Sequence, residues 1–145
     1  MSPAAERRLL QAAITVACLV PLAAGGAGVL SGPAMLKGVD SAPADLDSHL
    51  RYLSGLLLGL GIGFACCIPA IERRSALFRT LGAIAVLGGC ARLLSALSVG
   101  LPGTGHVFGL AMELGTVPLL MLWQARVARR CPRTITAGTA PAQTR

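Results

Sequence analysis

The sequence predicts an all-α integral membrane protein built as a bundle of four membrane-spanning helices. Four apolar runs are each about as long as the 20 residues that a helix needs to cross the hydrocarbon core of a bilayer. The composition agrees, because 54% of the 145 residues are hydrophobic, 13% are charged and the mean hydropathy is +0.69. The basic residues also gather on one side of the runs, as they do in polytopic membrane proteins.

The apolar runs place the four expected spans at residues 9–30, 52–71, 80–101 and 107–125. The first two spans contain no charged residue, the third contains only Arg92 and the fourth only Glu113. Short connections after the second and third spans predict antiparallel neighbours. We therefore expect a short N-terminus at 1–8, one membrane domain at 9–128, and a disordered tail at 129–145.

The distribution of positive charge predicts the orientation. Of the 13 basic residues, all but Lys37, Arg51 and Arg92 lie on the side of the membrane that also carries both termini. The positive-inside rule then makes both termini cytoplasmic. The net charge of +7 is accounted for by this topology signal, and with 3% aromatic residues the chain does not resemble a nucleic-acid-binding module. The first span could also be read as a cleaved signal peptide, but its length favours a retained helix.

Small residues predict where the helices approach one another. Gly55, Gly59 and Gly63 form two overlapping GxxxG steps in the second span. In membranes, such residues allow close packing between helices. We expect this stripe to face another helix of the bundle.

Arg92 and Glu113 are the two charged residues within the spans, and opposite charges inside a membrane usually pair. Counted from the outer ends of their helices, they lie at depths of about 13 Å and 9 Å, within one helical turn of each other. Adjacent antiparallel helices would therefore bring them together. Such a pair is either a structural element that fixes helix register or part of a ligand or proton site in the outer half of the bundle.

Polar residues at the heads of the second and fourth spans would surround the outer mouth above this pair. These candidates are Asp47, His49, Arg51, Tyr52 and His106. Asp47 and Arg51 are spaced i, i+4 and are expected to form a surface ion pair. Asp45, Asp47 and His49 do not converge when spaced by two on a helix, so we expect no metal site.

Several motifs together resemble the bacterial four-helix membrane proteins grouped as domain of unknown function 4345. The resemblance covers roughly residues 8–128. It rests on DSHLRYLSG at 47–55, PAIERR at 69–74, LFR at 77–79, GGCARLLS at 88–95, GLP at 100–102, and Glu113 with Trp123 and Gln124. It implies four spans in a bacterial plasma membrane, and it brings no established activity.

Three classes of function remain open. No P-loop, HExxH or GxSxG motif is present, and this favours a non-catalytic protein without a cofactor. Such a protein would be an accessory subunit or would bind a small ligand, lipid or quinone at the outer polar site. The alternatives are a proton-coupled transporter of small solutes and a redox-linked membrane enzyme with His49 or Glu113 as acid or base. The expected partners are the lipid bilayer, a second copy or another membrane subunit, and a small ligand.

Overall fold

The computed structural model describes residues 2–36, 38–39 and 41–130, and it confirms the all-helical fold class. Three long helices are continuous, and the fourth is formed by three consecutive segments. The elements are α1 (Pro3–Ser31), α2 (Ala44–Cys67), α3 (Ser75–Ser98), and then α4 (Thr104–Ala111), η3 (Met112–Thr116) and α5 (Val117–Arg130). The segment η3 is π-helical, and two short 3₁₀ turns, η1 (Gly32–Met35) and η2 (Ile68–Ala70), follow α1 and α2.

Each of the four helices is long and apolar enough to cross a membrane. The helical stretches that could each span a membrane are Pro3–Met35, Ala44–Ala70, Ser75–Ser98 and Thr104–Arg130. Large apolar side chains such as Val16, Leu94 and Leu122 point outward rather than into a core. An outer surface of this kind suits lipid rather than water. The helices extend beyond the predicted apolar runs at several ends. Arg129 and Arg130, predicted to lie in the tail, belong to α5, and residues 131–145 lie outside the described part of the chain.

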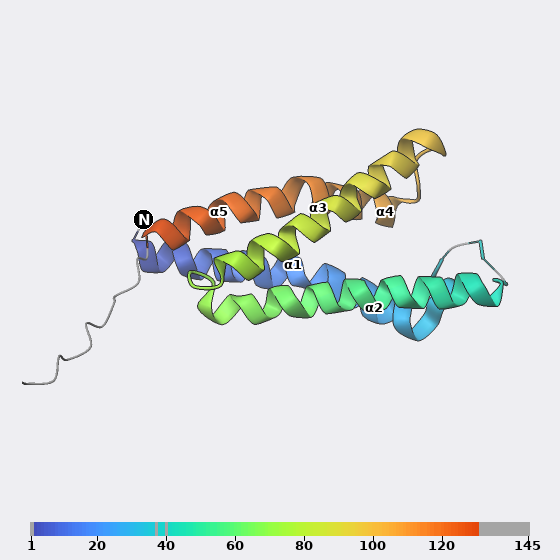
Figure 1. Cartoon of the computed structure of the whole chain (residues 1–145), viewed down its shortest axis with the longest axis horizontal. Coiled ribbons are helices and arrows are strands. Elements are labelled where there is room, and N and C mark those ends of the chain that lie inside the picture. The colour runs from blue at the N-terminus through green and yellow to red at the C-terminus, as the bar shows by residue number, and fades with distance from the viewer. Residues whose placement is uncertain (1, 37, 40, 131–145) are drawn as a thin grey trace, which may run out of the picture.

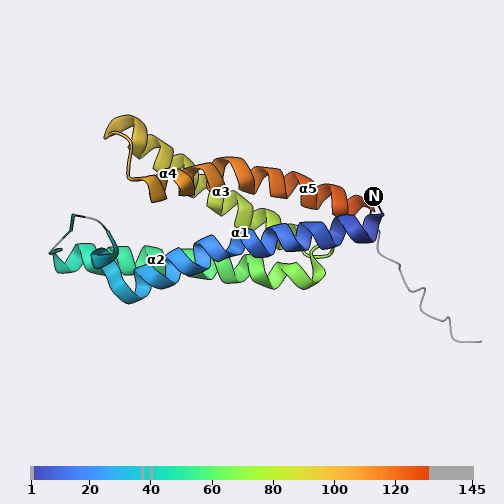
Figure 2. The ribbon, with the colours of Figure 1, turned by 180° about the vertical axis from the view of Figure 1, so that it is seen from behind.

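The helices form two hairpins that meet at one end and separate at the other (Figures 1 and 2). We call the end that holds the start of α1, the α2–α3 turn and the end of α5 the terminal end. The opposite end, with the α1–α2 and α3–α4 connections, is the distal end. Helix α1 runs along α2, whereas α3 and α4 diverge from this pair toward the distal end (Figure 1).

Glycines on α1 and α2 allow these two helices to pack closely. A Cβ atom on Gly25 would lie 2.6 Å from the backbone nitrogen of Leu58, and a Cβ atom on Gly28 would overlap the side chain of Ser54. Gly61 of α2 faces Leu22 of α1 in the same way, at 3.1 Å. Any larger residue at these positions would force the helices apart.

The predicted stripe on α2 is therefore not the face that packs against α1. A Cβ atom on Gly59 would meet nothing within 4 Å, and one on Gly55 would only reach Val29 at 4.0 Å. Gly63 instead faces α3, where Leu81 would lie 3.0 Å from its Cβ atom. The GxxxG spacing identifies small residues, but it does not determine which side of the helix is covered.

The apolar core lies at the terminal end, where all four long helices contribute to it. Leu10, Phe64, Phe78 and Val127 are buried there. The rings of Phe64 and Phe78 meet edge to face, with centroids 5.2 Å apart and an interplanar angle of 72°. This core joins the two hairpins at the end where they converge.

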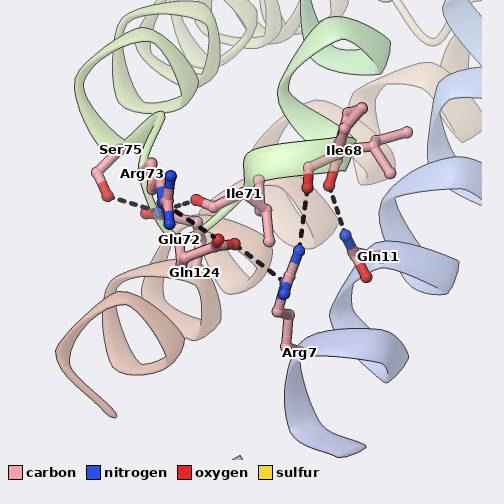
Figure 3. Close-up of polar contacts among 9 residues, drawn as sticks. Arg7, Gln11, Ile68, Ile71, Glu72, Arg73, Ser75 and Gln124 are labelled. Carbon is pink, nitrogen blue, oxygen red and sulfur yellow. Dashed lines mark hydrogen bonds and ion pairs between the residues drawn. The ribbon is translucent and has the colours of Figure 1, made fainter. Parts of the chain in front are cut away.

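Polar side chains hold the α2–α3 turn against α1 and α5 (Figure 3). Gln11 donates a hydrogen bond to the carbonyl oxygen of Ile68 at 2.7 Å, and the buried Gln124 donates to that of Ile71 at 2.8 Å. Arg7 forms an ion pair with Glu72, with Nε and Oε2 3.1 Å apart. Arg7 Nη2 also donates to the carbonyl oxygen of Pro69 at 3.0 Å. The three hydrogen bonds to carbonyl oxygens satisfy acceptors that the end of a helix leaves without a donor.

A second ion-pair cluster ties the start of α1 to the end of α5. The carboxylate of Glu6 is almost fully buried, with 5% of its side chain exposed, and it lies 2.9 Å from both Arg126 and Arg130. Packing and charge pairing therefore fix the terminal end of the bundle. The distal end lacks a comparable core among the described residues.

Candidate functional site

A cavity of about 550 Å³ lies between the two hairpins, and all four long helices contribute to its wall. Most of the wall is apolar, with Pro21, Leu57, Leu60 and Leu120 among the lining residues. Phe64 and Phe78 also line it and belong to the core at the terminal end. The volume falls within the range of sites for one small organic ligand.

The charged groups of this wall are Arg92 and Glu113, and the structure brings them together. Arg92 Nε donates to Glu113 Oε2 at 3.1 Å, and Nη2 donates to Oε1 at 3.2 Å. This is a two-pronged pairing, which is the strong geometry for a guanidinium and a carboxylate. Both side chains are partly exposed, Arg92 at 30% and Glu113 at 18%, because they border the cavity.

The position of Glu113 depends on the π-helical segment η3. Here the N–H group of Val117 bonds to the carbonyl of Met112, five residues back instead of four. The next residue is Pro118, which has no N–H group and whose ring crowds the carbonyl four residues earlier. A wider π turn accommodates this proline, and such turns are frequent at functional sites.

Two glycines lie beside the ion pair, and one of them is required for the close approach of the helices. A Cβ atom on Gly89 would lie 2.9 Å from the Cβ atom of Glu113, so α3 can approach η3 only because position 89 has no side chain. Gly109, one turn before Glu113, lies beside the guanidinium of Arg92, and a Cβ atom there would be in ordinary contact with Cζ at 3.7 Å. The ion pair therefore has a tightly packed side against α3 and an open side at the cavity.

Arg92 retains hydrogen-bonding capacity toward the cavity. A guanidinium has five N–H donors, and the pairing with Glu113 uses one on Nε and one on Nη2. Within the described part of the chain, no acceptor is bonded to Nη1. In a membrane interior these donors have no water to satisfy them, so an acceptor in the cavity would be favoured.

Only one of the predicted mouth residues lines the cavity. His106 does so, at the start of α4. His49 and Tyr52 are exposed on α2 and are not part of the lining. The structure therefore does not gather the predicted polar residues around one opening.

Asp47 and Arg51 instead fasten α2 to the end of α1. Arg51 Nε donates to Asp47 Oδ2 at 2.8 Å, while Nη1 donates to the carbonyl oxygens of Val29 at 2.7 Å and Leu30 at 3.1 Å. A basic side chain at the C-terminus of a helix satisfies free carbonyls and complements the helix dipole. Gly32, which follows with φ +54°, lets the chain turn beneath these two side chains.

Acidic, histidine and cysteine side chains do not gather into a metal-binding group. Within the described ranges, no three of them are placed to hold an ion. Sequence reasoning also missed Gly89 and Pro118, which together position Glu113. The proline in the middle of an apolar run was a usable signal, because prolines within membrane helices distort them locally.

The fold and the lipid-facing surface define a multi-pass integral membrane protein with four spanning helices. The chain belongs to the family described as Domain of unknown function (DUF4345), whose model matches residues 9–124. No curated protein and no solved structure matches the chain. The family assigns no activity, so a function must be argued from the cavity itself.

Proposed function

We propose that this protein binds a single-chain amphiphile from the membrane in the cavity between its two hairpins. The observation that carries the proposal is the composition of the cavity wall, which is mostly apolar and holds one ion pair. Sites for apolar small molecules have this design, in which a few polar groups orient a ligand held mainly by apolar contacts.

The position of the cavity favours binding over transport. The buried core at the terminal end, including Leu10, Ile14 and Phe78, lies between the cavity and that side of the molecule. A carrier needs a route that opens alternately to both sides of the membrane. A pocket backed by a packed core at one end is better suited to hold a ligand, or to present it to another protein.

The test is photolabelling with a sixteen-carbon alcohol that carries a diazirine near the middle of its chain. We expect label on residues that line the cavity, such as Phe64 and Phe78. Ala24 lines the cavity whereas its neighbour Ala23 is exposed, so the two positions provide a matched pair of variants. Ala24→Phe should reduce labelling of the cavity, and Ala23→Phe should leave it unchanged.

Two outcomes would contradict the proposal. Label spread evenly over the lipid-facing side chains, with no effect of Ala24→Phe, would mean that the cavity does not select a ligand. Cross-linking between two copies of the chain through cavity residues would mean that a second subunit fills the space.

We further propose that the membrane is the bacterial plasma membrane, with both termini in the cytoplasm. The support for the orientation is electrostatic, because Arg7 and Arg8, Arg73 and Arg74, and Arg129 and Arg130 all belong to the terminal end. Reporter fusions test this proposal. A fluorescent protein that matures only in the cytoplasm should be active at the C-terminus, and alkaline phosphatase at the same site should be inactive. Phosphatase activity there would reverse the orientation.

A further inference from the structure

We infer that the ligand carries an uncharged headgroup with an oxygen acceptor, such as a carbonyl or hydroxyl, and that the free N–H donors of Arg92 bind this oxygen. The inference rests on the proposed function, because it names the class of amphiphile that the same cavity selects. Three properties of the Arg92–Glu113 pair support it: its free donors, its charge balance and its surroundings.

The free donors determine which atom of the ligand is bound. Glu113 already engages Nε and Nη2 of Arg92, so the remaining N–H groups on Nη1 and Nη2 are available. The Arg92 side chain is 30% exposed, and both charged residues line the cavity. A headgroup oxygen beside Nη1 would satisfy donors that otherwise lack a partner in a water-poor environment.

The charge balance determines the charge of the headgroup. Arg92 and Glu113 neutralise each other through two hydrogen bonds at 3.1 and 3.2 Å. A sulfonate or phosphate would add a negative charge close to Glu113, and an ammonium would add a positive charge close to Arg92. Either leaves one charge without a partner inside the membrane, which is unfavourable. An uncharged oxygen adds hydrogen bonds and leaves the pair intact.

The surroundings determine where the rest of the molecule lies. From the ion pair, the lining continues through Leu60 and Leu120 to Phe64 and Phe78 at the terminal end. An alkyl chain placed there would contact apolar side chains along its length. His106 of α4, seven residues before Glu113, also lines the cavity.

The experiment compares four probes with the same sixteen-carbon chain: 2-hexadecanone, hexadecanesulfonate, hexadecyltrimethylammonium and hexadecane. Their dissociation constants for the purified full-length chain are measured by native mass spectrometry in nonionic micelles. Binding to the Ala24→Phe variant is subtracted as the background. We expect the ketone to bind about 10- to 100-fold more tightly than hexadecane, because it gains a hydrogen bond to a charged donor. The two charged probes should bind about 100-fold more weakly than the ketone.

A variant isolates the contribution of Arg92. In Arg92→Leu with Glu113→Leu, both charges and all the donors are removed together, so no unpaired charge remains. The ketone should then bind no better than hexadecane. If this variant does not fold, Arg92→Gln with Glu113→Gln keeps polar groups at both positions, and the ketone should still bind it more weakly than it binds the wild type.

The outcomes separate the inference from the proposed function. If the sulfonate or the ammonium binds as tightly as the ketone, the inference is overturned and an amphiphile-binding cavity stays in place. If hexadecane binds as tightly as the ketone, the inference is overturned and the cavity binds apolar chains whatever headgroup they carry. If no probe binds above the Ala24→Phe background, both the inference and the proposed function are overturned.

Discussion

Replacing Arg92 and Glu113 singly and together should reveal a large coupling energy between them. The bonded nitrogen and oxygen atoms are 3.1 and 3.2 Å apart. Two unit charges about 4 Å apart attract each other by roughly 4 kcal/mol at an effective dielectric constant of about 20. Exposure of 30% and 18% of the two side chains moderates this figure. Removing either partner leaves the other charge alone inside the membrane, at a cost of about 3 kcal/mol. We therefore expect Arg92→Ala to lower the free energy of unfolding by about 3 kcal/mol, and Glu113→Ala to lower it by a similar amount.

The double variant distinguishes coupled from independent contributions. Because it leaves no unpaired charge, it should lose about 3 kcal/mol or less, whereas independent effects would add to about 6 kcal/mol. The free energy of unfolding is measured by reversible denaturation in mixed micelles of a nonionic detergent and dodecyl sulfate, with helical circular dichroism as the signal. An additive result would refute the pairing as a source of stability, since the two side chains would then act separately.

Three further predictions concern contacts that hold the helices together elsewhere in the bundle, and they use the same measurement. Gly25→Ala should lower the free energy of unfolding by about 1–3 kcal/mol because it overpacks the α1–α2 interface, whereas Gly26→Ala meets open space and should have little effect. Arg51→Ala should cost more than Asp47→Ala, because it also removes two hydrogen bonds to the end of α1; equal losses would contradict this assignment. Glu6→Gln should cost about 2 kcal/mol by leaving two arginines without their carboxylate, and an unchanged stability would show that this cluster is dispensable.

The sequence alone predicted the four spans and the meeting of Arg92 with Glu113. The spans follow from the length of the apolar runs, and the meeting follows from the depth of each charge on antiparallel helices. The Asp47–Arg51 pair also followed from its i, i+4 spacing. These are local properties, or properties of one helix beside another, and the residue order encodes them directly.

The cavity could not be predicted, because it depends on the angle between two hairpins. That angle is set by contacts at the terminal end, such as Glu6 with Arg130 and Gln124 with Ile71, which join residues far apart in the chain. The sequence also could not show which face of α2 packs against α1. Gly59 and Gly61 are both glycines in the same apolar run, yet of these two only Gly61 faces α1. The pattern shows that small residues are present, and the tertiary structure determines which of them are covered.

The separation of the hairpins at the distal end has a consequence for how affinity should be expressed. The cavity wall is mostly apolar, and in a bilayer the acyl chains of the surrounding lipid can enter an apolar gap between spanning helices. Binding of a specific amphiphile is then an exchange, in which one chain leaves as another enters. Its apparent strength depends on the mole fraction of the ligand among the lipids and not on its concentration in water. The protein would in effect report the composition of the membrane around it.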